Sequence, residues 1–283
     1  MEIMKLVRNP LRFLRDARTP ESLVLAFSDD RLLLKRTQDD AGIGLPTVSD
    51  LERLGITGRF PMAVGEIDGI PVEAWDVPDS PELSEDWCLE GVRSLVGIVD
   101  ERLFTVIGRG AHLIHWRRTS EHCGVCGAIT ELTGPEFALR CPSCGYSQFP
   151  RISPSVVVLI EDGSRCLLTH ESEFQTGLFT CLAGFVEPGE TLEQAIHREV
   201  HEEVGLVVSD LRYFGSQPWP YPDGLMVGFH ARYAGGVIRK RDGELREARW
   251  FDVGELPLLP GSFSLARQLI DDFRARVLPA VSE

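Results

Sequence analysis

The pattern of apolar and polar positions is clearest in the C-terminal half of the chain. The run from Val156 to Ile160 is continuously apolar and predicts a buried strand, which a turn at Asp162 and Gly163 would end. Further apolar or strand-like segments follow at 166–168, 182–186, 211–216, 226–233 and 248–252. Helical patterns begin near residue 191 and cover 264–277. Strands followed by a helix, and then more strands and a helix, predict an α/β sandwich.

The first 119 residues show a weaker pattern. Short strand-like runs at 23–27, 32–34 and 103–107 alternate with turns rich in Gly and Asp, and residues 87–99 fit a short helix. We therefore predict a small α+β domain over residues 1–119.

The composition is that of a globular protein. The chain has 283 residues, 43% hydrophobic and 25% charged, which is enough for a sizeable core. No apolar run is long enough to cross a bilayer, and no apolar stretch with a cleavage site follows the first basic residues. We therefore expect a cytoplasmic protein with no membrane partner.

The charge balance restricts the substrates. The formal net charge is −14, from 29 basic and 43 acidic residues, and no segment is basic. This disfavours binding to nucleic acid through its phosphates alone, because such binding needs several Lys or Arg side chains. A polyphosphate substrate would need a metal ion to offset the repulsion.

Four of the seven cysteines form two closely spaced pairs, CGVC and CPSC, separated by 14 residues. The glycines that follow the pairs allow the sharp turns that a metal site needs. The pairs predict a zinc ribbon over residues 120–150, with one structural zinc ion per chain. Its predicted ligands are Cys123, Cys126, Cys141 and Cys144.

Two other interpretations of the cysteine segment stay open. The four cysteines could be unrelated buried residues, or the ribbon could bind nucleic acid. The second is weakened by composition, because the segment holds one Arg and three acidic residues. The remaining cysteines, Cys88, Cys166 and Cys181, fit small core residues.

The segment 184–206, GFVEPGETLEQAIHREVHEEVGL, predicts a loop followed by an amphipathic helix. Thr191 and Gln194 have the spacing of a capping box, and Gly205 is suited to end the helix. An apolar residue recurs at every fourth position, as expected for a face turned to the core. This stripe consists of Ile196, Val200 and Val204.

Three glutamates of this helix, Glu199, Glu202 and Glu203, fall within an arc of roughly 100°. Like charges on one helix face repel and would lower stability unless cations lie between them. Mg²⁺ binds carboxylates together with water and substrate phosphates, so the arc predicts a metal site. The alternative is a solvated acidic helix face.

The same segment resembles the Nudix box, GX5EX7REUXEEXGU, in which U is a bulky aliphatic residue. The matching residues are Gly184, Glu190, Arg198, Glu199, Val200, Glu202, Glu203, Gly205 and Leu206. The resemblance implies a hydrolase that cleaves a nucleoside diphosphate linked to another moiety. It implies that Glu199 and Glu203 bind metal, with Glu202 as a further ligand, and that Glu190 and Arg198 brace the loop and helix.

A second motif, SQPWPYP, lies at 216–222. Its prolines would hold Trp219 in a stiff loop that suits stacking on a base, although a half-buried Trp in a turn fits the same residues. A Nudix box preceded by a four-cysteine ribbon and followed by this motif resembles the NADH pyrophosphatase family. Specific motifs carry this resemblance over residues ~85–283, and position alone carries it before them.

Members of that family hydrolyse NADH or NAD to a nicotinamide mononucleotide and AMP, and some remove NAD caps from the 5′ ends of RNA. The resemblance implies these substrates and a homodimer for this chain. It also implies an α+β chain in which the N-terminal domain and the zinc ribbon precede a Nudix α/β/α sandwich with a mixed sheet at 151–283.

The resemblance also assigns site residues. Glu203 is expected to be the most critical acid, with Glu202 as rival general base. The ligands of Mg²⁺ or Mn²⁺ would be Glu199, Glu202, Glu203, Glu244 and the main-chain carbonyl of Ala183. The substrate-side positions would be Gln217, Pro218, Trp219, Pro220, Tyr221, Pro222, Asp223, Gly224, Phe185, Phe149, Arg93, Glu136 and Ala266.

Two positions depart from the family pattern. Phe149 stands where Tyr is common, and Gly224 stands where the loop usually has Ser, so two hydroxyls are missing. Preference among NADH, NAD and capped RNA therefore stays open. Two other functions also stay open: hydrolysis of ADP-ribose or another conjugate, and regulation by nucleotide or RNA binding without turnover.

Overall fold

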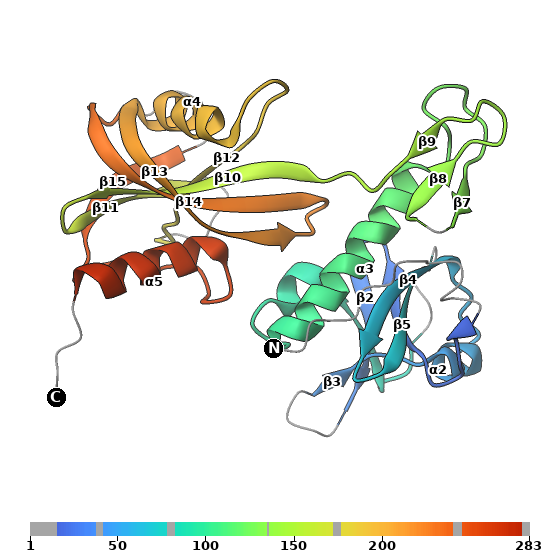
Figure 1. Ribbon diagram of the computed structural model, residues 1–283. Coiled ribbons are helices and arrows are strands. Elements are labelled where there is room, and N and C mark those ends of the chain that lie inside the picture. The colour runs from blue at the N-terminus through green and yellow to red at the C-terminus, as the bar shows by residue number, and fades with distance from the viewer. Residues whose placement is uncertain are drawn as a thin grey trace. The chain divides into compact units, whose positions relative to one another are not determined.

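The computed structural model describes residues 16–37, 42–77, 83–134, 136–171, 177–239 and 245–278. It divides into two compact units, each of which is described by itself (Figure 1). The N-terminal unit comprises Met1–Arg151 and Pro220–Asp223, and the C-terminal unit comprises Ile152–Trp219 and Gly224–Glu283. No helix among the described residues is long and apolar enough to cross a membrane.

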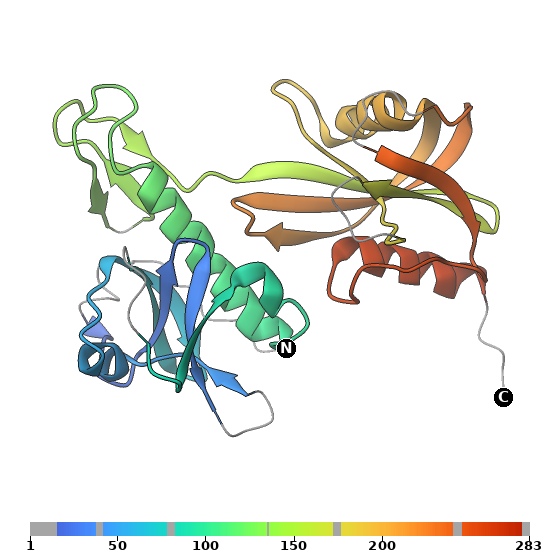
Figure 2. The same cartoon turned by 180° about the vertical axis from the view of Figure 1, so that it is seen from behind.

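The C-terminal unit is a six-stranded mixed sheet between two helices. The order is β13-β14-β10-β11-β15, with β12 paired to β10; β10 and β14 are parallel and the other pairs antiparallel. The strands are β10 (Ser153–Asp162), β11 (Arg165–Glu171), β12 (Leu182–Phe185), β13 (Leu206–Trp219), β14 (Gly224–Gly236) and β15 (Leu245–Asp252). Helices α4 (Leu192–Val204) and α5 (Leu265–Val277) cover opposite faces, as Figures 1 and 2 show. The predicted α/β/α sandwich with a mixed sheet is confirmed.

The sequence of β10 does not alternate between apolar and polar residues, because both faces of this strand are buried. Val156, Val158 and Ile160 belong to the core that includes the buried residues of α4. Val157 and Leu159 point to the other face and belong to the core that includes α5. A central strand that is covered on both faces can be apolar at every position.

Helix α4 begins and ends where the sequence predicts. The Thr191 hydroxyl accepts from the Gln194 backbone N–H, and the Gln194 side chain accepts from the Thr191 N–H at 2.8 Å, which completes the capping box. Gly205 ends the helix with φ of 72°, a left-handed conformation that favours glycine. These caps fix which residues of α4 face the sheet.

The N-terminal unit repeats this topology in a shortened form. Its sheet has the order β3-β2-β1-β5-β4, with β6 paired to β2, and β1 and β5 are parallel as β10 and β14 are. The strands are β1 (Leu23–Ser28), β2 (Arg31–Arg36), β3 (Ile43–Gly44), β4 (Arg59–Ile67), β5 (Ile70–Asp76) and β6 (Trp87–Gly91). Helix α2 (Val48–Arg53) packs on one face and α3 (Glu101–Thr119) on the other. The position of α4 is thus taken here by a six-residue helix.

Two local predictions for the N-terminal part are wrong. Residues 103–107 lie in α3 rather than in a strand, because Asp100 caps the helix and a face that includes Val106 and Ile107 packs on the sheet. Residues 87–99 begin with strand β6, which pairs with β2, and continue as a short 3₁₀ turn at Val92–Leu95. In both places the packing of the sheet outweighs local propensity.

The cysteine segment forms a three-stranded antiparallel sheet within the N-terminal unit. Its strands are β7 (Glu131–Thr133), β8 (Ala138–Arg140) and β9 (Ser147–Gln148). Leu139 on β8 is fully buried and joins the core that α3 contributes to. The ribbon is therefore packed onto the rest of this unit, although the predicted boundaries at 119 and 150 stay untested.

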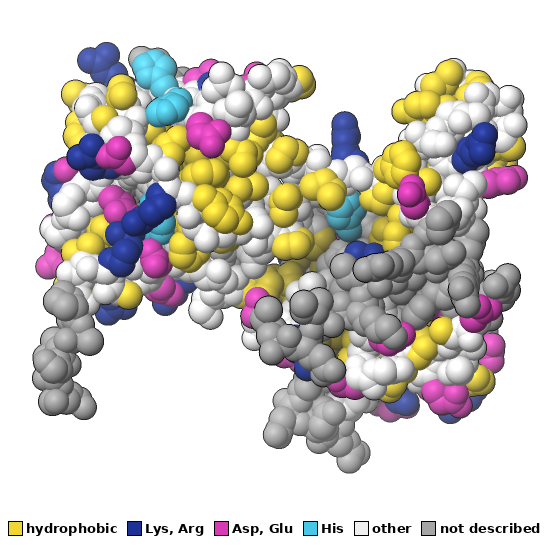
Figure 3. All heavy atoms as spheres, viewed as in Figure 1, with side chains coloured by type: hydrophobic (Ala, Val, Ile, Leu, Met, Phe, Trp, Pro, Cys, Tyr) yellow, Lys and Arg dark blue, Asp and Glu magenta, His cyan; other side chains and the backbone are white. Residues whose placement is uncertain are grey.

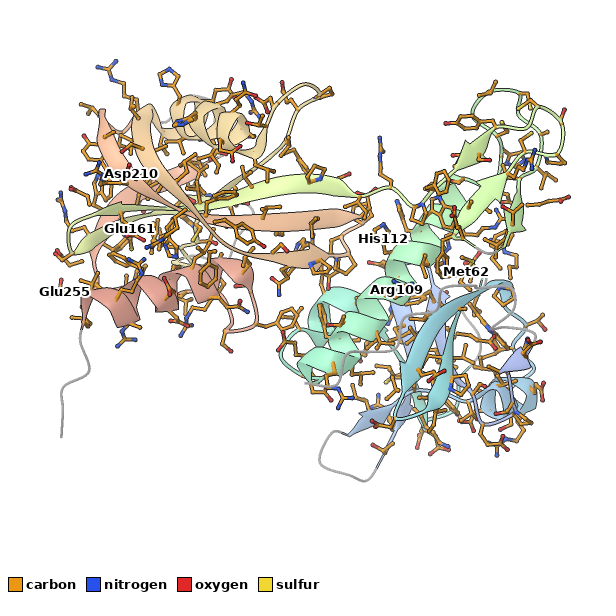
Figure 4. All side chains as sticks on the ribbon, in the orientation of Figure 1. Met62, Arg109, His112, Glu161, Asp210 and Glu255 are labelled. Carbon is orange, nitrogen blue, oxygen red and sulfur yellow. The ribbon has the colours of Figure 1, made fainter. Side chains whose placement is uncertain are left out.

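A cluster of polar side chains around the buried His230 ties α5 to the sheet of the C-terminal unit. His230 on β14 lies 2.6 Å from Glu161 and 3.0 Å from Asp272, and Arg276 contacts both carboxylates. Figure 4 labels Glu161, on β10. Burial raises the pKa of Glu161, but hydrogen bonds from His230 and Arg276 outweigh it, so its net pKa lies below the ordinary value.

We predict that Glu161→Gln destabilises the protein by about 1–2 kcal/mol at pH 7. Because the folded-state pKa is lowered, the contribution of Glu161 is present above the ordinary carboxyl pKa of 4.5 and is lost as the pH falls through the folded-state value. Urea unfolding of both proteins from pH 7 down to about pH 3, which extends into the range below 4.5, measures this. A stability difference that does not shrink at low pH would contradict it.

Candidate active site

The four paired cysteines come together at one point of the ribbon. Their sulfur atoms all lie within 4.8 Å of one another, with 3.6 Å between Cys123 and Cys144 and 3.4 Å between Cys126 and Cys141. A tetrahedral zinc ion with Zn–S bonds of about 2.3 Å separates its sulfurs by about 3.8 Å. The four side chains could therefore hold such an ion, and four protein ligands leave no open coordination position.

The turns at the cysteine pairs favour thiolates at Cys123 and Cys141, the first cysteine of each pair. Gly127 and Gly145 have φ of 76° and 78°, and the backbone N–H groups of Val125 and Cys144 point at sulfur atoms. The N–H of Val125 helps to lower the pKa of Cys123, and the N–H of Cys144 lowers the pKa of Cys141 to about 6. Metal binding needs the thiolate, so the backbone prepares these ligands.

A second polar centre lies around Arg198 on α4. Its guanidinium donates to both carboxylate oxygens of Glu190, at 2.7 and 2.9 Å, and to the carbonyl of Phe185 at 2.8 Å. It also lies 2.9 Å from Glu199 and 3.1 Å from Glu202. The hydrogen bonds from Arg198 lower the pKa of Glu190 to about 2. Arg198 thus braces the loop before α4 and partly neutralises the acidic face.

Glu199 lies directly against strand β12. A Cβ atom built on Gly184 would come within 2.0 to 2.5 Å of the Glu199 carboxyl group, so only glycine leaves room for it. The Gly184 carbonyl in turn accepts from the Ser155 hydroxyl at 2.8 Å. Burial raises the pKa of Glu199. The Glu199 carboxylate is therefore held against the backbone of Gly184, which directly follows Ala183.

The other two glutamates differ in exposure. Glu203 is only 6% exposed, whereas the side chain of Glu202 is 56% exposed. Within the described ranges, only the four cysteines bring three or more ligand atoms close enough to hold a metal. Glu199 and Glu202 are drawn to Arg198 instead. Oxygen ligands on one helix face beside the glycine cradle fit a hard divalent cation, which would compete with Arg198.

The SQPWPYP motif is divided between the two units. Gln217 and Trp219 lie on β13, and the Gln217 carboxamide bonds the main chain of Phe263 and Leu265. Pro220–Asp223 belong to the N-terminal unit, where the Arg93 guanidinium lies 4.8 Å from the centre of the Tyr221 ring. Burial raises the pKa of Tyr221 to about 12. The structure therefore brings Arg93 and Tyr221 together, as two of the predicted substrate-side residues.

Arg93 and Tyr221 line a cavity of about 430 Å³ within the N-terminal unit. Asp29 and Asp30 of this lining come from the turn between β1 and β2, and His115 and Arg118 come from α3. No sequence motif links these two segments, so the sequence did not indicate the cavity. The lining residues are Phe27, Asp29, Asp30, Gly91, Val92, Arg93, Ala111, Ile114, His115, Arg118, Pro220, Tyr221 and Pro222.

The remaining predicted site residues are scattered. Phe149 and Phe185 are 58% and 64% exposed, so their rings are open to a ligand. Glu136 is exposed on the ribbon, and Ala266 lies in the first turn of α5. Glu244 lies outside the described residues.

Gly224 has a structural reason to depart from the family serine. It pairs with Trp219 at the end of the β13–β14 hairpin, and a Cβ atom there would lie 3.0 Å from the Trp219 carbonyl oxygen. A serine would require the hairpin end to widen.

The close contact between Gly184 and the Glu199 carboxyl group gives a test of the acidic face of α4. We predict that Gly184→Ala displaces the Glu199 carboxylate and weakens Mn²⁺ binding at least about tenfold. Gly254→Ala is the matched control, since nothing lies within 4 Å of its added methyl group. Mn²⁺ titration followed by electron paramagnetic resonance measures both variants. Equal affinity in both would contradict the placement of Glu199.

The family comparisons agree with this architecture. The profile described as NUDIX domain matches residues 151–273, and the profile described as NADH pyrophosphatase-like rudimentary NUDIX domain matches residues 21–116. A crystal structure of a NUDIX hydrolase from Nitrosomonas europaea is similar, with 24% identity, a TM-score of 0.43, and coverage of 54% of this chain and 87% of that one.

Curated relatives cover both units. The NAD-capped RNA hydrolase NudC of Stutzerimonas stutzeri is 41% identical over 243 residues, which is 85% of this chain and 86% of the relative. The protein of the same name from Deinococcus radiodurans is 39% identical over 270 residues, which is 93% of this chain and 92% of the relative. The predicted resemblance is confirmed: the chain is an enzyme of the Nudix hydrolases and belongs to their NudC, or NADH pyrophosphatase-like, family.

Proposed function

We propose that this enzyme hydrolyses the pyrophosphate bond of NADH or NAD to a nicotinamide mononucleotide and AMP. The same cleavage at the 5′ end of an NAD-capped RNA would remove the cap. The observation that carries the proposal is the identity of about 40% to curated NAD-capped RNA hydrolases, which extends over both units. The complete acidic box on α4 supports it, since hydrolysis of this bond needs a site for divalent metal.

We propose that Mg²⁺ or Mn²⁺ binds at Glu199 and Glu203, with Glu202 and the carbonyl of Ala183 as further ligands. A metal ion there would withdraw charge from the phosphates. The Gly184 cradle keeps Glu199 beside β12, and Arg198 offsets the charge of the neighbouring acids. Glu244 remains a proposed ligand from the family pattern alone.

The reaction itself requires one proton transfer. Water attacks one phosphorus, a new P–O bond forms, and the bond between that phosphorus and the bridging oxygen breaks, so that this oxygen leaves with the bonding electron pair on the other phosphate. A glutamate takes the proton of the attacking water and returns it to solvent. Glu203 is our first choice because it is the least exposed of the three glutamates, and Glu202 is the rival base.

Substrate binding is proposed for the exposed aromatic side chains. Phe185, next to Gly184, and Phe149 present open rings that could stack on a base or on nicotinamide. Trp219, at the end of β13, and, in the N-terminal unit, Arg93 and Tyr221 are proposed substrate contacts on the family pattern. Glu136 and Ala266 are proposed on the family pattern alone.

We further propose that the ribbon ion is zinc and that two chains form a homodimer. The choice of zinc is supported by four thiolate ligands at tetrahedral spacing. The dimer is supported by large apolar side chains exposed on the ribbon, where a second copy could cover them. They are Val125, Ile129 and Tyr146.

The zinc proposal predicts about one zinc ion per wild-type chain. Cys141→Ser should lose that zinc and unfold at lower temperature, because the ion links two distant segments of the ribbon. Cys88→Ser, on β6, is the matched control and should keep its zinc. Atomic absorption and calorimetry provide the two measurements. Full zinc content in Cys141→Ser would contradict the assignment.

The activity is tested by product analysis with Mg²⁺ or Mn²⁺ on NADH, NAD and ADP-ribose. We expect AMP and reduced nicotinamide mononucleotide from NADH, and a kcat/KM for NADH above that for ADP-ribose. Glu203→Gln should lower kcat by a factor on the order of 10²–10⁴ with an unchanged fold. The exposed Glu193, on the first turn of the same helix, is the control as Glu193→Gln. Near-normal turnover of Glu203→Gln would exclude the assigned role, and preferred turnover of ADP-ribose would favour the other conjugates.

A further inference from the structure

Gln217 lies in the SQPWPYP motif, yet its side chain is engaged by the protein itself. Its carboxamide nitrogen donates to the Phe263 carbonyl at 2.9 Å, and its carboxamide oxygen accepts from the Leu265 N–H at 2.9 Å. One side chain of β13 therefore bonds the main chain on both sides of Ser264, the N-cap of α5.

The first turn of α5 depends on these bonds. The first N–H groups of a helix have no partner within the helix. The Ser264 hydroxyl accepts from the Arg267 N–H, which satisfies one of them. The Leu265 N–H is satisfied from outside the helix, by Gln217.

The sheet also provides a seat for Leu265. Gly215 on β13 and Gly228 on β14 are direct neighbours across the hairpin, and Leu265 packs over both with 4% of its surface exposed. A Cβ atom at Gly228 would lie 3.2 Å from the Leu265 side chain, closer than packed atoms normally come. The two glycines leave room for the Leu265 side chain, and Gln217 bonds the Leu265 main chain.

We propose that Gln217 is a positioning residue, which fixes the first turn of α5 against the sheet, rather than a side chain that binds the substrate. The proposal rests on the proposed function in one respect, because the turn carries Ala266, a proposed substrate contact. The Ala266 carbonyl also accepts a hydrogen bond from the Cys181 thiol at 3.4 Å. Turning the Gln217 carboxamide toward a substrate would break the two main-chain bonds that hold this turn.

Amide hydrogen exchange on the full-length protein tests the proposal without any substrate. In Gln217→Ala the Leu265 amide should exchange at least about tenfold faster, while the amides of α4 are unchanged. Gln268→Ala is the matched control, because Gln268 donates to the same Phe263 carbonyl at 3.1 Å but accepts nothing from Leu265. Its Leu265 amide should exchange as in the wild type. Unchanged exchange in Gln217→Ala would overturn the proposal.

Gln217→Glu keeps the proposal falsifiable if Gln217→Ala does not fold. Its carboxylate can still accept from the Leu265 N–H, but its second oxygen now faces the Phe263 carbonyl and repels it. We expect the Leu265 amide to exchange faster than in the wild type, with the amides of α4 unchanged. Exchange of Leu265 equal to that of the wild type would show that the two main-chain bonds do not hold this turn, and would overturn the proposal. A wild type that does not cleave NADH would refute the proposed function but leave the exchange result valid.

Discussion

Crowding of negative charge on one face of α4 is the constraint on which the rest of the site depends. Three carboxylates within one turn and a half of a helix repel one another, and this is acceptable only with positive charge beside them. Arg198 supplies part of that positive charge, because its guanidinium forms ion pairs with Glu190, Glu199 and Glu202. The geometry around it, from the loop before α4 to the carbonyl of Phe185, serves to hold this one guanidinium.

The chain builds the same strand order twice but equips only one copy for chemistry. The C-terminal unit has a 13-residue α4 with the full acidic box, whereas α2 of the N-terminal unit has six residues. Its Asp50 caps the helix and pairs with Lys35 and Arg53, so it is used for stability. On the face shown in Figure 3, basic and acidic side chains are interspersed.

The parts that could be predicted from the sequence are those governed by local chemistry. Thr191, Gln194 and Gly205 define α4 because capping acts within one turn, and the paired cysteines define the ribbon by their spacing alone. Helix α3 and strand β6 were missed, since their conformations are decided by a sheet assembled from distant segments. The cavity beside Arg93 and Tyr221 was missed for the same reason.

The sequence also could not reveal what individual motif residues do. Gly184 matches a pattern, but only the structure shows that a carboxylate occupies the space of its absent Cβ. Gln217 matches a substrate motif, but its carboxamide bonds the main chain around Ser264. A motif records which residues occur together, and the contacts decide whether each one binds a ligand or holds the fold.

The central claim is that α4 and β12 together form the site for the catalytic metal. Anomalous diffraction from crystals grown with Mn²⁺ tests it most directly, because it locates the ion without assuming a substrate. The account predicts anomalous density beside the carboxylates of Glu199 and Glu203 and the carbonyl of Ala183. Density elsewhere, with Glu199 and Glu202 still paired to Arg198, would contradict it.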